Sequence, residues 1–170
     1  MPLLIDFKHH PMIHPFWGQI EESWAGLAAE HPVILPGFEQ PIEVFLGEEL
    51  HEEDEEYILT TAQFDEYAAT LKNFMARAPE QLAALQARAF ARYQQVYARW
   101  YEDPARSGEP ALGLTTAAAH AAYLREINYL RVSDGHILRL VLSYELDPEQ
   151  GLEAKFVANT LVDIGGIAET

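Results

Sequence analysis

Hydrophobic and polar residues follow two different periods along this chain. Across residues 61–103, apolar side chains recur every three or four positions, which is the spacing of one helix face. On both sides of this block, apolar and polar residues alternate in short runs, as they do along a strand with one buried face. The pattern therefore predicts strands at both ends of the chain and helices between them.

The N-terminal part is predicted to be an antiparallel meander of short strands. Pro36-Gly37 and Gln40-Pro41 punctuate it as turns, and prolines are tolerated at strand ends and edges. The predicted strands cover residues 16–22, 24–28, 32–36 and 41–46.

Three helices are predicted, over residues 61–77, 79–103 and 116–127. Thr60 or Thr61 caps the first, and Thr115 or Thr116 caps the third. Pro79 suits the first position of the second helix, which stops at Asp103-Pro104. We expect the apolar stripe of this long helix to be buried along its whole length; it consists of Leu82, Leu85, Ala89, Tyr93, Val96 and Trp100.

Strands return near the C-terminus. Ser133-Asp134-Gly135 is predicted to be a hairpin turn, followed by strands over residues 138–146, 152–157 and 161–164. The order of strands, helices and strands is typical of the α+β class. We therefore expect residues 1–170 to form a single α+β domain, with an antiparallel sheet from both chain ends and about three helices packed on one face.

The charge of the chain is strongly negative and unevenly placed. The 27 acidic and 11 basic residues give a net charge of -16. Residues 1–75 contribute 15 acidic and 2 basic residues, a net of -13, whereas residues 76–131 contribute 5 acidic and 7 basic residues, a net of +2. Such a surface repels nucleic acids and anionic membranes, and it attracts a basic protein partner.

Composition excludes several kinds of site and location for this protein. The chain has no Cys, which excludes disulfides, a thiolate nucleophile and Cys-based zinc sites. Residues 1–16 lack the apolar core of a signal peptide, and no run of about 18 apolar residues occurs. We therefore expect a cytoplasmic location and no membrane association.

The densest acidic run lies at residues 48–56. It lacks the alternating ligands and the central Gly of a calcium-binding EF-hand loop, so it is interpreted either as a solvated loop or as a docking surface for a basic partner. The predicted partner-binding residues are the seven acids of the run, Glu48, Glu49, Glu52, Glu53, Asp54, Glu55 and Glu56.

No motif for catalysis is recognisable. His9, His10 and His14 form the only His cluster, and its alternatives are a zinc or nickel site and a packed or exposed terminal segment. Asp147 and Glu149 lie in a segment with Pro and Gly, which favours a solvated turn over a catalytic carboxylate pair. No Ser stands in a Gly-x-Ser-x-Gly motif. We therefore expect no catalytic residues, no bound metal and no cofactor.

The large aromatic residues and His120 are predicted to have structural or interface positions. Most of the large aromatics are expected in the core; they are Trp17, Trp24, Trp100, Tyr93, Tyr97 and Tyr101. Tyr97 and Tyr101 flank the stripe of the long helix, so one of them is a candidate interface anchor. His120 is expected to be a hydrogen-bonded His at the surface or in an interface.

Several short motifs resemble a family of uncharacterised bacterial domains of unknown function. They are Phe16-Trp17-Gly18-Gln19-Ile20 with Trp24-Ala25-Gly26, residues 42–46, Gln63-Phe64, and the segment at residues 142–152. Relatives often carry Trp-Asp and then Glu-His-Gly in the last segment, where this chain has Leu146 and Gln150 in place of the Trp and the His. Some similar proteins look like immunity proteins of bacterial toxin systems.

These observations favour a non-catalytic protein-binding module. Its concrete form is an immunity protein that neutralises a basic toxin. Two alternatives from other classes stay open: a small metal-dependent hydrolase that uses the N-terminal His cluster, and a structural or oligomeric scaffold.

Overall fold

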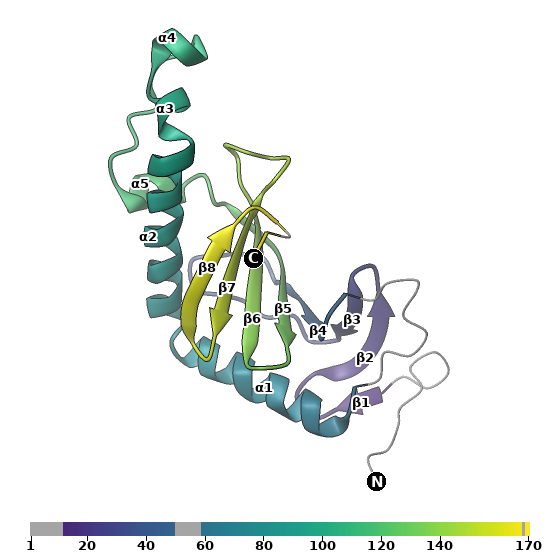
Figure 1. Cartoon of the computed structure of the whole chain (residues 1–170). Coiled ribbons are helices and arrows are strands. Elements are labelled where there is room, and N and C mark those ends of the chain that lie inside the picture. The colour runs from purple at the N-terminus through teal and green to yellow at the C-terminus, as the bar shows by residue number, and fades with distance from the viewer. Residues whose placement is uncertain (1–11, 50–58, 168) are drawn as a thin grey trace.

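An eight-stranded sheet forms the centre of the computed structural model, which describes residues 12–49, 59–167 and 169–170 (Figure 1). The strands lie in the sheet in the same order as in the chain. The N-terminal half consists of β1 (Met12–His14), β2 (Gly18–Ser23), β3 (Gly26–Ala29) and β4 (Glu43–Leu46). The C-terminal half consists of β5 (Glu126–Ser133), β6 (Ile137–Ser143), β7 (Leu152–Val157) and β8 (Thr160–Gly165).

Neighbouring strands are antiparallel, except where the two halves of the sheet meet. There β4 pairs with β5 in parallel, with Phe45 opposite Arg131. A parallel pair needs a long crossover, and the helical block between the two halves supplies it. The prediction of an α+β fold with a sheet from both chain ends is confirmed, but the sheet contains this one parallel pair.

The helical block contains α1 (Thr61–Ala76), α2 (Ala78–Val96), α3 (Ala98–Tyr101), α4 (Pro104–Ser107) and α5 (Ala117–Ala121). Thr60 caps α1 as predicted, because its hydroxyl accepts from the Gln63 N–H while the Gln63 side chain accepts from the Thr60 N–H. The long predicted helix is divided at Tyr97, and its last turns are the separate helix α3.

The core lies between the sheet and these helices. Alternate residues of the central strands face it, including Leu130 and Val132 of β5 and Leu140 of β6, each less than 1 % exposed. One face of α1 covers them with Phe64, Tyr67, Leu71 and Phe74, all buried. The first half of α2 adds Leu82, Leu85, Ala89 and Tyr93.

The second half of α2 extends past the end of the sheet as an arm that continues into α3 and α4 (Figure 1). Leu85 is 2 % exposed, but Val96 and Trp100 are each 52 % exposed. The predicted burial of the whole stripe is therefore wrong beyond Tyr93, because the sheet does not reach this part of the helix.

The predicted number and arrangement of helices also need correction. Where a helix over residues 116–127 was expected, α5 ends at Ala121, and residue 126 already begins β5. Rather than lying on the sheet, α5 packs beside α2. In the N-terminal part, β1 was not predicted, and the strand expected at residues 32–36 is reduced to one bridge between Val33 and Ile42. The turn at Ser133-Asp134-Gly135 is confirmed.

None of the helices in the described parts of the chain is long and apolar enough to cross a membrane.

Candidate functional site: an acidic groove beside an exposed tryptophan

The sheet has a second face, opposite α1 and α2, whose residues follow from the strand register. Because side chains alternate along a strand, residues that are paired across neighbouring strands point to the same face. One row crosses seven strands in this way: Glu21, Ala28, Phe45, Arg131, Arg139, Lys155 and Asp163. Along the row, an acidic side chain on β2 is followed by an aromatic ring on β4 and by basic side chains on β5, β6 and β7.

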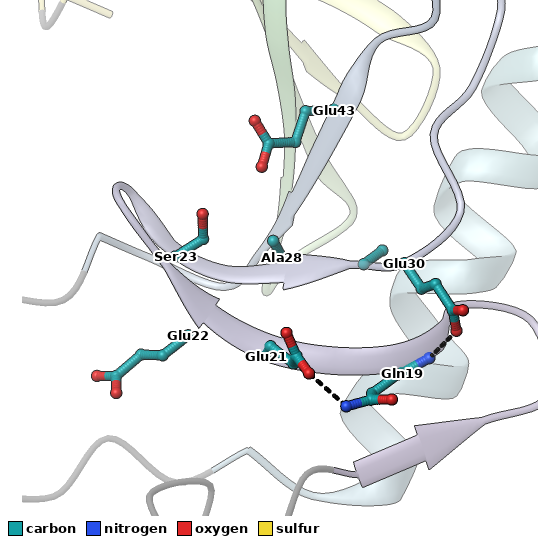
Figure 2. Close-up of a pocket in the computed structure, with 8 residues that line it drawn as sticks. Gln19, Glu21, Glu22, Ser23, Ala28, Glu30 and Glu43 are labelled. Carbon is teal, nitrogen blue, oxygen red and sulfur yellow. Dashed lines mark hydrogen bonds between the residues drawn. The ribbon is translucent and has the colours of Figure 1, made fainter.

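A groove of about 370 Å³ is hollowed into the acidic end of this face (Figure 2). Strands β2, β3 and β4 provide its walls, and no Lys or Arg is among its lining residues. The charged or polar residues that line it are Gln19, Glu21, Glu22, Ser23, Glu30 and Glu43. Strands β2 and β4 and the residue that follows β3 thus bring Glu21, Glu43 and Glu30, separated by up to 22 positions in the chain, to one concave surface.

The groove is built on a fixed backbone. The Glu30 carboxylate accepts a hydrogen bond of 2.7 Å from the Gln19 N–H, and the Gln19 side chain donates to Glu21, as Figure 2 shows. Gly18 makes this approach possible, since it has φ +72° and a Cβ at this position would lie 2.5 Å from a Glu30 carboxylate oxygen. Glu22 points away from the other labelled carboxylates in Figure 2.

Trp24 stands beside the groove, in the turn between β2 and β3. Its indole is 70 % exposed, although its ring packs edge-to-face on Phe45 and Tyr129 with centroid distances of 5.1 and 5.4 Å. The Nε1–H donates to the Glu43 carboxylate at 3.2 Å. Burial raises the pKa of the Tyr129 phenol, so this supporting ring stays neutral. Trp24 is therefore an exposed aromatic side chain in a fixed orientation.

Arg131 supports the aromatic residues from within the protein. It is 4 % exposed, and its guanidinium donates to the carbonyl oxygens of Gly47 and Ala25 at 2.8 and 2.6 Å. Glu49, the second residue of the predicted acidic docking surface, lies 3.8 Å from it. These contacts satisfy and balance the buried charge, as burial of a guanidinium requires.

The acidic run is only partly within the described residues. Glu48 and Glu49 are exposed just after β4, but Glu52, Glu53, Asp54, Glu55 and Glu56 lie outside the residues that the structure describes. The four groove carboxylates were not among the predicted site residues. A signal for them was present in the predicted strand 16–22, where Gln19 and Glu21 stand at alternate positions around the buried Ile20.

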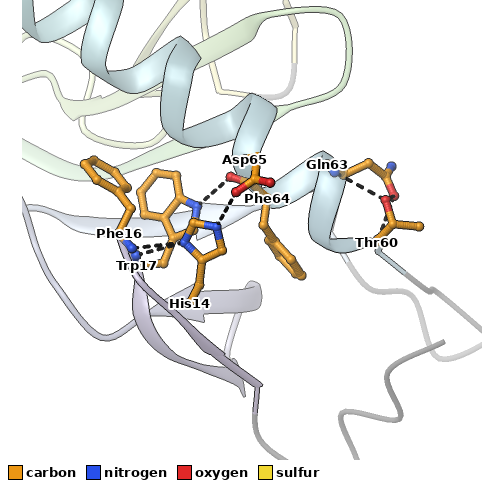
Figure 3. A network of polar contacts seen from close by, with 7 residues as sticks. All are labelled: His14, Phe16, Trp17, Thr60, Gln63, Phe64 and Asp65. Carbon is orange, nitrogen blue, oxygen red and sulfur yellow. Dashed lines mark hydrogen bonds and ion pairs between the residues drawn. The ribbon is translucent and has the colours of Figure 1, made fainter. Parts of the chain in front are cut away.

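The His cluster is likewise divided by the limits of the described chain. His9 and His10 lie outside it, whereas His14 is buried in β1 beside α1 (Figure 3). The His14 Nδ1 accepts from the Phe16 N–H at 3.1 Å, and its Nε2 lies 2.9 Å from an Asp65 carboxylate oxygen. Both ring nitrogens are thus engaged within the protein, which leaves His14 no lone pair for a metal. Among the described residues, no group of three or more His, Asp or Glu side chains has the geometry to hold a metal ion.

Contrary to the sequence-based expectation, His120 is fully buried. Its Nε2 lies 2.7 Å from the Tyr144 hydroxyl, and the rings of Phe90 and Tyr93 pack around it. Burial lowers the pKa of His120 below its usual value, so the imidazole is neutral at pH 7. Its inaccessibility makes it a structural residue between α5 and α2.

The remaining candidates have structural partners. Asp147 lies in a turn, as predicted, and accepts a hydrogen bond of 2.7 Å from the Tyr97 hydroxyl. The Tyr101 hydroxyl donates to the Leu146 carbonyl oxygen at 2.6 Å. The hydroxyls of both candidate tyrosines are thus bonded within the protein, and both side chains are partly buried. Of the six large aromatics, Trp17 and Tyr93 are buried, Tyr97 and Tyr101 are partly buried, and Trp24 and Trp100 are exposed and so do not belong to the core.

Comparisons with known proteins add no relative: no family model, no curated protein and no solved structure matches this chain.

Proposed function

We propose that this protein is a binding module that captures a basic protein partner in the groove between β2, β3 and β4. The observation that carries the proposal is that Glu21, Glu30 and Glu43 gather, with Glu22 directed outward, around one concave surface whose lining includes no basic residue. A basic partner is steered to such a surface and neutralises its charges on docking. An immunity protein that occludes a basic toxin is the concrete form of this function.

The net charge of -16 supports the same partner class. A negative field attracts a basic protein and speeds its association, and it repels the phosphates of nucleic acids. The exposed Trp24 beside the groove adds an aromatic contact of the type that often dominates binding energy in interfaces. The groove therefore combines negative charge with an aromatic contact, whereas the acidic run at residues 48–56 supplies negative charge and no aromatic contact.

Two variants of equal net charge test the proposal. The groove variant replaces its four carboxylates with Gln (Glu21→Gln, Glu22→Gln, Glu30→Gln and Glu43→Gln), and the loop variant does the same in the acidic run (Glu52→Gln, Glu53→Gln, Glu55→Gln and Glu56→Gln). The probe is a fluorescein-labelled octalysine peptide, and its Kd is measured by anisotropy at low and at physiological salt. Gln keeps the acceptor oxygens that Gln19 and Trp24 use, so the fold of the groove variant is expected to persist.

The groove variant is expected to lose more affinity than the loop variant. Three exposed ion pairs, from Glu21, Glu30 and Glu43, at about 0.5 kcal/mol each amount to about 1.5 kcal/mol, or about 10-fold in Kd at low salt, and added salt reduces this difference. An equal loss in the two variants would show that only net charge matters. A larger loss in the loop variant would move the binding surface to the acidic run.

A further inference from the structure

The only polar group of the Trp24 side chain, its indole N–H, is hydrogen-bonded within the protein. Its Nε1–H donates to the Glu43 carboxylate, and its ring stands almost perpendicular to those of Phe45 and Tyr129, at 85° and 81°. With 70 % of the residue exposed, the surface that remains for a ligand is mainly a face of the indole. The face of an aromatic ring carries partial negative charge and attracts cations.

The protein's own cations are placed over other rings. The Arg131 guanidinium lies 5.3 Å from the Phe45 centroid and 5.8 Å from that of Tyr129. Elsewhere, Arg92 lies over Tyr97 and Lys72 over Phe16. Within the described parts of the chain, no Lys or Arg occupies the Trp24 ring. The Glu49 carboxylate, 3.8 Å from Arg131, offsets the repulsion that this guanidinium exerts on a second cation.

Glu43 makes the site selective for one kind of cation. One of its oxygens, Oε2, accepts from the Trp24 indole, and among the described residues Oε1 accepts no hydrogen bond. A carboxylate at the edge of an exposed indole suits a planar guanidinium, which stacks on the ring and donates to the carboxylate at the same time. The compact ammonium of lysine does not stack in this way.

We propose that Trp24 and Glu43 bind an arginine side chain of the basic partner. This inference rests on the proposed function, because the arginine belongs to the partner that the groove captures. Glu21 and Glu30, which also line the groove, then attract the basic residues around that arginine. The groove supplies charge attraction to any basic segment, and Trp24 supplies the preference for arginine over lysine.

The test compares octaarginine with octalysine, two peptides of equal charge, by fluorescence anisotropy. The protein variants are wild type, Trp24→Leu and Trp100→Leu. Trp100 is the matched control, because it is a second exposed tryptophan that lies on the helical arm, away from the groove. Thermal unfolding of each variant checks that it folds, and the exposure of both side chains leads us to expect small changes.

Wild type and Trp100→Leu are expected to prefer octaarginine by the same factor. Trp24→Leu is expected to reduce that factor by about 2- to 5-fold, the range of one exposed cation–π contact. An unchanged factor in Trp24→Leu overturns the arginine site, even where the groove variant still weakens both peptides and so supports the proposed function. An equal reduction in Trp100→Leu overturns it too. If neither peptide binds in a salt-dependent way, the proposed function fails and the arginine site fails with it.

Discussion

Truncation of two residues on one helix stripe tests how the fold divides α2 into a covered half and a free arm. Leu85 and Val96 belong to the same apolar stripe, but Leu85 is 2 % exposed and Val96 is 52 % exposed. Leu85→Ala removes fully packed methyl groups and leaves a cavity, which costs about 2–5 kcal/mol. Val96→Ala removes half-solvated methyl groups and is partly offset by the better helix propensity of Ala, so we expect a change within about 0.5 kcal/mol.

Urea unfolding followed by far-UV circular dichroism measures both free energies of unfolding. For a protein of this size, the Leu85→Ala loss corresponds to a decrease in Tm of about 2–4 °C per kcal/mol. The slope of the free energy against urea concentration is expected to match that of wild type, which shows that only stability has changed. A loss below about 0.5 kcal/mol for Leu85→Ala, or an equal loss for Val96→Ala, would refute the division of the helix.

Two further predictions concern stability. Because burial lowers the pKa of His120, the folded protein binds a proton at this imidazole less readily than the unfolded chain does. The stability that comes from the neutral imidazole is complete above about pH 6.5, the usual pKa of His, and is lost as the pH falls through the folded-state pKa. His120→Gln is thus expected to flatten the decline in unfolding free energy between pH 7 and 5. His136→Gln, at an exposed position, serves as the control. Parallel curves for wild type and His120→Gln would contradict the role of His120 in this decline. Gly18→Ala is expected to lower the Tm more than Gly37→Ala, because both glycines have positive φ but only at Gly18 does a Cβ collide with Glu30 and His31; equal melting temperatures would contradict this reasoning.

Local patterns in the sequence determined much of the secondary structure. The N-cap at Thr60, the turn at Ser133-Asp134-Gly135 and the strand at residues 152–157 depend on neighbouring residues, so they were predicted correctly. Residues 116–127 were predicted incorrectly because the Ala-rich start of this segment favours a helix. Pairing with β4 and β6 instead extends the chain from residue 126 into β5.

The sequence by itself thus determined the class of the fold, its strong negative charge and the types of most elements, because these depend on composition and on contacts between near neighbours. Tertiary structure alone decided the site. Glu21 and Glu43 share one groove only because β2, β3 and β4 pair in register. Trp24 packs on Phe45 and Tyr129, which come from β4 and β5, and still leaves most of its surface exposed. In the same way, Val96 has the spacing of a core residue, but the sheet ends before it. Periodicity shows which side of an element is apolar, whereas the length and position of the packing partner decide how much of that side is buried.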